Sequence, residues 1–189
     1  MPKTDQYGLI MFDLDGTLAE YKSDVLYPDV AEYLKNTKRQ AGAIMGTPSW
    51  VIVTNQGGIG LRHWMEFGNW GNPETLPTLE DFSKRIDKLF PDVHDDYKFW
   101  IFMCARYQSK KGVWSPIPDH QNGLAMWNKE WRKPQAGMLH QAMIVTGYPP
   151  GACLMVGDRE EDQLAAEAAK VDFMWAYEFF GREKPSDEQ

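Results

Sequence analysis

Three features are scarce in this 189-residue sequence: cysteine, long apolar runs and an excess of positive charge. The two cysteines, Cys104 and Cys153, lie far apart, so we expect two buried free thiols rather than a disulfide. No apolar run approaches the roughly 18 residues that cross a bilayer, and the first eight residues contain no apolar signal core. These absences predict a cytoplasmic protein with no membrane partner.

Charge and composition narrow the class of protein further. The chain carries 20 basic and 27 acidic side chains, which argues against a broad electrostatic surface for nucleic acid. An apolar content of 43% is enough to build a folded core and excludes a largely disordered chain. No GxxxxGK[ST] phosphate loop occurs, and His63 stands where a dinucleotide-binding fingerprint near Gly58 would need its third glycine. A P-loop protein and a nicotinamide or flavin enzyme are therefore disfavoured.

Five short apolar runs alternate with four segments of helical spacing. This alternation predicts a doubly wound α/β fold around a mainly parallel, Rossmann-like sheet, in which ligands bind at the carboxyl ends of the strands. The predicted strands are Leu9–Phe12, Trp50–Thr54, Phe99–Met103, Cys153–Val156 and Phe173–Ala176. The predicted helices contain Val30–Thr37, Phe82–Leu89, Met138–Met143 and Asp162–Lys170.

Two segments fit this alternation poorly. Residues 61–77 contain Gly, Asn and Pro breakers after a short possible helix, and residues 104–132 carry three tryptophans with Pro116, Pro118 and Gly123 between them. We expect both to form long loops or a small lid over the active-site face of a single domain that spans residues 1–180, with no large cap. Residues 181–189 are expected to form a flexible tail.

A pair of aspartates follows the first predicted strand, in the stretch Asp13-Leu-Asp15-Gly-Thr17. A structural turn explains Asp15 and the glycine after it, but it leaves a second carboxylate directly after an apolar strand unexplained. An EF-hand is excluded because its fifth and sixth loop positions would be Thr17 and Leu18. The aspartate pair is therefore a candidate for chemistry.

Other polar pairs stand at strand ends and helix starts: Thr54 with Asn55, Arg132 with Lys133, and Asp158 with Asp162. The first pair precedes a glycine-rich turn whose backbone N–H groups can hold phosphate oxygens. The basic pair precedes a predicted helix, where it is either part of a site or a solvated charge pair. The acidic pair follows an apolar strand, which fits either a site or the capping of the next helix.

In a parallel sheet, all these side chains converge on one crevice. Clustered carboxylates need a hard cation, for which Mg²⁺ with oxygen ligands is the obvious choice. A hydroxyl, an amide, backbone N–H groups and a lysine then face an anion that carries several oxygens. The set as a whole predicts metal-assisted phosphoryl chemistry.

The order DxDGT, TN, K and GDxxxD, which spans Ile10 to Asp162, resembles the haloacid dehalogenase (HAD) superfamily of phosphotransferases. The resemblance implies a phosphatase in which Asp13 is the nucleophile and forms an aspartyl-phosphate. It implies that Asp15 protonates the leaving oxygen and then activates water. It also implies that Mg²⁺ is held by the Asp13 carboxylate, the Asp15 backbone carbonyl and Asp158.

The same resemblance assigns roles to the remaining polar residues. Thr54 and Lys133 would bind the transferring phosphoryl group, and Arg132 would contribute to the binding of phosphate. Asn55 would orient the nucleophile or the substrate. Asp162 would support the metal site from behind its ligands.

The residues that flank the motifs indicate the class of substrate. TNQGGIG and RKPQAGML are similar to the subgroup that contains histidinol-phosphate phosphatases, heptose bisphosphate phosphatases and polynucleotide 3′-phosphatases, and GDREED is more similar to the small-metabolite members. The zinc loop of several such members is missing, since the interval before the lysine motif holds one cysteine, Cys104. In its place, the tryptophan-rich segment either contacts substrate or packs on the body.

A phosphorylated small metabolite, such as a sugar phosphate or histidinol phosphate, is therefore the favoured substrate. Nucleic-acid 3′-phosphate ends are the first alternative. A phosphomutase and a non-catalytic binding module on the same fold are the others, because a fold does not by itself define a function.

Overall fold

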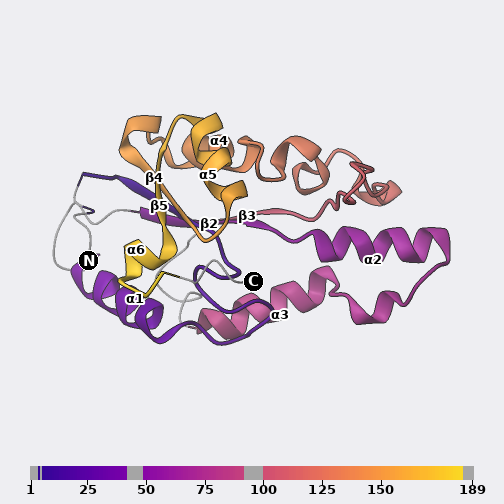
Figure 1. Ribbon diagram of the computed structural model, residues 1–189, viewed down its shortest axis with the longest axis horizontal. Helices are drawn as coiled ribbons and strands as arrows, with labels where there is room; N and C mark the ends of the chain where they lie inside the picture. Colours follow the sequence, from indigo (N-terminus) through magenta and orange to yellow (C-terminus); the bar gives the residue numbers. More distant parts are fainter. Residues whose placement is uncertain (1–3, 5, 42–48, 92–99, 185–189) are drawn as a thin grey trace.

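A five-stranded parallel sheet forms the centre of the molecule, and helices cover both of its faces (Figure 1). The structure is a computed structural model that describes residues 4, 6–41, 49–91 and 100–184. The strand order is β3-β2-β1-β4-β5, so β1 lies in the middle and the chain winds outward from it in both directions. This is the doubly wound α/β fold that the alternation of strands and helices predicted.

The strands coincide closely with the five predicted apolar runs. They are β1 (Leu9–Phe12), β2 (Ser49–Asn55), β3 (Ile101–Cys104), β4 (Cys153–Gly157) and β5 (Asp172–Trp175). Phe99, the predicted first residue of the third strand, lies outside the described residues. The register pairs Phe12 with Ile52 of β2 and with Val156 of β4, so the three central strands end side by side.

Four helices lie where helical spacing predicted them: α1 (Pro28–Ala41), α3 (Leu79–Leu89), α4 (Gly137–Thr146) and α5 (Glu160–Ala169). A short additional helix, α6 (Ala176–Phe180), follows β5. At the start of α3, the Thr78 hydroxyl accepts from the N–H of Asp81, and the Asp81 carboxylate accepts from the N–H of Thr78. This reciprocal capping box fixes where α3 begins.

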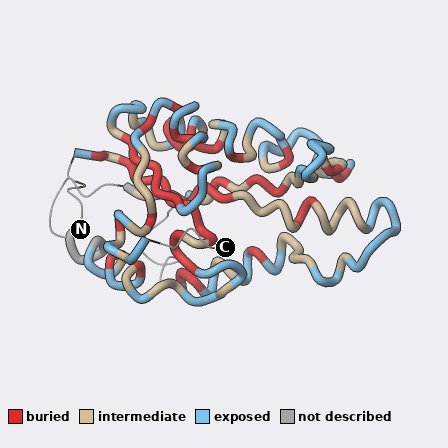
Figure 2. Tube along the Cα trace, in the orientation of Figure 1, coloured by how far each residue is buried: buried red, intermediate tan, exposed pale blue. Residues whose placement is uncertain are grey.

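Alternate residues of the central strands face opposite helical layers. Ile10 and Phe12 pack in the core cluster that contains side chains of α1, α3 and α6, whereas Leu9 and Met11 pack in the cluster that contains side chains of α4 and α5. Because both faces of the sheet are covered, β1 and β4 are buried along their whole length instead of alternating apolar and polar residues. They form the buried centre of the molecule (Figure 2).

The first part of residues 61–77 is helical, where the sequence allowed a short helix before the breakers. The helix α2 (Gly57–Gly68) runs through the glycine-rich stretch and ends at Asn69, whose φ of 51° is left-handed. Gly60 permits close packing, because a Cβ there would lie 2.4 Å from the carbonyl oxygen of Ala105. Packing of α2 against the segment after β3 thus outweighs the low helix propensity of its glycines.

The tryptophan-rich segment, residues 104–132, contains turns and short 3₁₀ helices beyond the end of β3. Trp127 is 2% exposed and joins the core, where its indole N–H donates to the side-chain oxygen of Gln121. The ring of Trp131 packs against Phe102 of β3. These contacts favour packing over substrate contact for both tryptophans. The described residues include 3₁₀ helices at Pro73–Thr75, Asp119–Gln121, Ala125–Trp127, Lys129–Trp131 and Pro150–Ala152.

The tail expected at residues 181–189 is anchored as far as it is described, to residue 184. Arg182 pairs with Asp29 at 2.6 Å and donates to the carbonyl oxygen of Thr17 at 3.1 Å. Gly181, with a φ of 71°, ends α6 and turns the chain toward these partners. A tertiary ion pair, which sequence position alone does not reveal, therefore anchors Arg182, and residues 185–189 of the predicted tail lie outside the described residues.

Cys104 and Cys153 are buried free thiols, as predicted. Burial raises the pKa of both thiols, that of Cys153 to about 11, so neither is primed to act as a nucleophile. Within the described ranges, we find no helix of sufficient length and apolarity to cross a membrane.

Candidate active site

The predicted site residues gather at the carboxyl ends of the three central strands. Asp13 follows β1, Thr54 lies near the end of β2, and Asp158 follows β4. Lys133 reaches the same point from the segment before α4, and Asp162 reaches it from the first turn of α5. The convergence follows from the parallel register of the strands.

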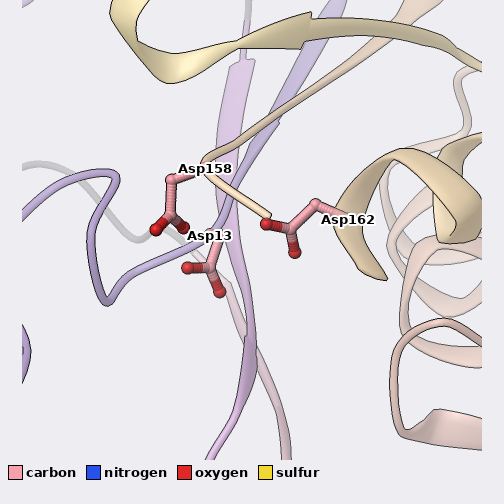
Figure 3. Close-up of side chains that lie close together, drawn as sticks. All are labelled: Asp13, Asp158 and Asp162. Atoms are coloured by element: carbon pink, nitrogen blue, oxygen red, sulfur yellow. The ribbon is translucent and has the colours of Figure 1, made fainter. Parts of the chain in front are cut away.

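Three carboxylates, those of Asp13, Asp158 and Asp162, point toward one another (Figure 3). One oxygen of each lies within 4.8 Å of the others. Asp13 and Asp162 are buried, while the Asp158 side chain is 28% exposed to solvent. Two glycines make room for this approach: a Cβ on Gly157 would lie 2.4 Å from the Asp162 side chain, and one on Gly16 would lie 2.1 Å from an Asp158 oxygen.

The ammonium of Lys133 holds two of these carboxylates together. Its Nζ lies 2.6 Å from Oδ1 of Asp13 and 2.5 Å from Oδ1 of Asp162, and it donates to the carbonyl oxygen of Val53 at 2.9 Å. Lys133 is only 2% exposed. A charge buried this deeply is tolerated because its three N–H donors meet two carboxylates and a carbonyl.

Negative charge exceeds positive charge in the cluster, since three carboxylates face one buried ammonium. Burial raises the pKa of Asp13 and of Asp158, although the charge of Lys133 opposes the rise in both. Burial acts to lower the pKa of Lys133, but the carboxylates of Asp13 and Asp162 outweigh it and raise that pKa. The cluster is therefore short of positive charge, which a divalent cation would supply.

The oxygen donors fit a hard cation such as Mg²⁺. Both oxygens of Asp162 already have partners, since Oδ1 forms an ion pair with Lys133 and Oδ2 accepts from the backbone N–H of Arg159 at 3.1 Å. One oxygen of Asp13 faces Lys133 as well. The second oxygen of Asp13 and the carboxylate of Asp158 would thus hold the ion, with Asp162 orienting Lys133 behind them.

Asn55 holds the main chain of Lys133, whereas Arg132 contacts the segment after β3. The Asn55 side chain donates to the carbonyl oxygen of Lys133 and accepts from its N–H, both at 3.0 Å. In the structure, then, Asn55 orients the residue that contacts the candidate nucleophile. Arg132 donates to the carbonyl oxygen of Arg106 at 3.2 Å, and its Nη1 lies near the start of α2, 2.9 Å from where a Cβ on Gly57 would be.

Asp15 is two residues from Asp13, but its carboxylate has a different set of partners. Arg85 donates from Nη2 to Oδ1 at 2.7 Å, and Gln56 donates from Nε2 to Oδ2 at 2.8 Å. The same Gln56 nitrogen lies 3.0 Å from the hydroxyl oxygen of Thr54. The two aspartates of the first motif are thus separated by their hydrogen bonds, which suits them to different tasks.

Sequence reasoning missed Gln56 and Arg85. Gln56 directly follows Thr54 and Asn55, and this position next to two candidate site residues could have marked it as a third. Arg85 lies inside α3, far from every motif in the sequence. No local pattern marks it, because only the packing of α3 beside the loop after β1 brings it to Asp15.

Gly16→Ala is expected to weaken Mg²⁺ binding by about 10-fold, because the new Cβ must displace the Asp158 carboxylate. Gly123→Ala is the matched control. Both glycines have a φ of 91°, which a side chain disfavours at either position, but nothing lies within 4 Å of a Cβ at residue 123. Calorimetric titration with Mg²⁺ measures the affinities, and equal affinities for the two variants would contradict a ligand role for Asp158.

Comparison with known proteins agrees with this arrangement. A family model described as HAD-hydrolase-like matches residues 130–176, which include Lys133, Asp158 and Asp162. D-glycero-beta-D-manno-heptose-1,7-bisphosphate 7-phosphatases from Haemophilus ducreyi and Pasteurella multocida are 33% and 29% identical to the chain over 121 residues, which is 64% of this chain. The matches cover 55% and 54% of those proteins, so the chain spans about half the length of these curated relatives.

Solved structures share the fold. The crystal structure of D,D-heptose 1,7-bisphosphate phosphatase from B. bronchiseptica, complexed with magnesium and phosphate, matches with a TM-score of 0.58 at 20% identity, covering 87% of this chain and 78% of that one. The family match and the two curated relatives support a phosphatase of the HAD superfamily, and this structural likeness supports the fold. Within that superfamily, the chain resembles the heptose bisphosphate phosphatases.

Proposed function

We propose that the protein is a Mg²⁺-dependent phosphomonoester hydrolase that transfers a phosphoryl group first to Asp13 and then to water. The observation that carries this proposal is the separation of the two aspartates. Asp13 lies in the carboxylate cluster beside Lys133, whereas Asp15 is held outside the cluster by Arg85 and Gln56. One carboxylate is placed to attack phosphorus and the other to move a proton.

In the first step, an oxygen of Asp13 forms a bond to phosphorus as the bond from phosphorus to the leaving oxygen breaks. The leaving oxygen takes the electron pair of that bond and a proton from Asp15. Lys133 contacts the nucleophile directly and reduces its repulsion with the anionic substrate. Bound Mg²⁺ would supply further positive charge that stabilises the oxygens of the transferring group.

In the second step, a water oxygen attacks phosphorus and the Asp13 carboxylate leaves. Asp15, which gave up its proton in the first step, accepts a proton from this water. Inorganic phosphate and the free carboxylate of Asp13 are regenerated. Splitting one displacement into two in this way lets a single buried carboxylate replace a free water as the first nucleophile.

We infer that the substrate is a small phosphorylated metabolite of the sugar bisphosphate class. The support comes from relatives whose names specify heptose 1,7-bisphosphate. The burial of Trp127 supports this class over nucleic-acid ends, because it leaves that ring unavailable for stacking on bases.

Phosphate release from a substrate panel tests the proposal. The panel contains heptose 1,7-bisphosphate, histidinol phosphate, a 3′-phosphorylated oligonucleotide and an aryl phosphate, each with Mg²⁺ or with EDTA. We expect Mg²⁺-dependent release that is fastest with the heptose bisphosphate. A preference for the oligonucleotide would overturn the substrate class, and an absence of release from all four would overturn the hydrolase itself.

A further inference from the structure

The side chain of Arg85 connects α3 to the loop after β1 at the position of Asp15. Its Nε donates to the carbonyl oxygen of Ser23 at 2.6 Å, and its Nη2 donates to Oδ1 of Asp15 at 2.7 Å and to the carbonyl oxygen of Glu20 at 3.3 Å. The ion pair is well covered, with side-chain exposures of 13% for Arg85 and 11% for Asp15. One guanidinium thus binds the carboxylate and the loop that carries it.

The two oxygens of Asp15 have partners of different kinds. Oδ1 faces the guanidinium and the backbone N–H of Lys22 at 3.4 Å, and neither of these groups can accept a hydrogen bond. Oδ2 faces the side-chain amide of Gln56, which contains both a donor and an acceptor and can present either one by rotating. Only Oδ2 therefore has a partner that tolerates both the carboxylate and the carboxylic acid.

We propose that Arg85 is the positioning residue for Asp15, which it holds by Oδ1 so that Oδ2 is the oxygen that exchanges the proton with the leaving group and with water. The inference rests on the proposed hydrolase mechanism and adds a residue to it. Gln56, which also contacts Thr54, links this oxygen to the end of β2. Proton transfer from Oδ2 to the leaving oxygen, and later from water to Oδ2, leaves the contacts of Arg85 unchanged.

A positioning role of this kind has a consequence that a purely structural role lacks. Protonation of the leaving oxygen matters greatly for an alkyl phosphate, whose alkoxide is a poor leaving group. It matters little for 4-nitrophenyl phosphate, whose phenolate leaves readily without a proton. Loss of Arg85 should therefore change the ratio of the two activities in the first step, and this ratio does not depend on how much of the protein is folded.

The test compares wild type, Arg85→Lys and Arg85→Gln in single-turnover phosphorylation of the enzyme by an alkyl phosphate and by 4-nitrophenyl phosphate. We expect Arg85→Gln to slow the alkyl reaction by about 100-fold and the aryl reaction by less than about 10-fold. Arg85→Lys should fall between Gln and wild type, because an ammonium can replace the charge but not the contacts to both Asp15 and Ser23.

Lys88→Gln is the matched control, since Lys88 lies on the same helix and pairs with Asp24 of the same loop, in an exposed contact. We expect this variant to keep the wild-type ratio. Equal losses on the two substrates in the Arg85 variants, or no loss on either, would overturn the positioning role while leaving the hydrolase intact. If the wild type reacts with neither the alkyl phosphate nor 4-nitrophenyl phosphate, the proposed function itself is overturned.

Discussion

Asp13→Asn is expected to reduce phosphate release by about 10⁴-fold or more, the largest effect of any single substitution in this protein. The amide has nearly the same shape as the carboxylate but is a far weaker nucleophile. It also removes one of the carboxylates that would hold Mg²⁺. Steady-state release of inorganic phosphate from the heptose bisphosphate, or from an aryl phosphate if that is the better substrate, measures the effect.

Stability provides a second readout for the same variant. The substitution relieves part of the excess negative charge among Asp13, Asp158 and Asp162, so we expect the melting temperature in EDTA to stay the same or rise. Inactivity together with retained stability separates a lost nucleophile from a misfolded protein. Asp24→Asn, which removes an exposed carboxylate paired with Lys88, is the control and should keep full activity. Substantial turnover by Asp13→Asn would refute the assignment of the nucleophile.

Lys133→Met is expected to lower the free energy of unfolding by about 3–5 kcal/mol when measured in EDTA. The reason is the burial of its partners: without the ammonium, Asp13 and Asp162 lose their contacts at 2.6 Å and 2.5 Å, and the Val53 carbonyl loses a donor. Methionine fills much of the volume, so the loss reports uncompensated charge more than a cavity. Urea unfolding monitored by tryptophan fluorescence measures it.

Mg²⁺ should recover part of this stability, because a cation that binds the folded state adds positive charge beside the same carboxylates. Activity should remain low even with Mg²⁺, since the ammonium beside the nucleophile is missing. Lys84→Met, which breaks an exposed pair with Glu80 on α3, is the matched control, and we expect a change of less than about 1 kcal/mol there. A loss no larger than that of the control would contradict a structural role for the buried lysine.

Much of the sheet could be predicted from the sequence, because its strands are short, mostly apolar and separated by segments of helical spacing. The parallel arrangement of these strands also predicted where the site lies. In a parallel sheet, a polar residue directly after a buried strand must lie at the shared carboxyl edge, so Asp13, Thr54 and Asp158 were placed without knowledge of their contacts.

The parts that sequence could not predict depend on tertiary packing. Glycines in α2 indicated a loop, yet Gly60 is required by close approach to Ala105 within a helix. The expected flexible tail lacks any local sign of the ion pair between Arg182 and Asp29. Arg85 similarly sits within an ordinary amphipathic helix pattern, and its role depends on where α3 packs.

The most direct test of the central claim is to locate the phosphoryl group on the protein. The enzyme is mixed with substrate and Mg²⁺, quenched in acid within one turnover, treated with borohydride to trap an acyl phosphate, and mapped by peptide mass spectrometry. We expect the modification on Asp13 in the wild-type protein and none in Asp13→Asn. Turnover without any modified aspartate, or modification at a residue other than Asp13, would contradict the proposed mechanism.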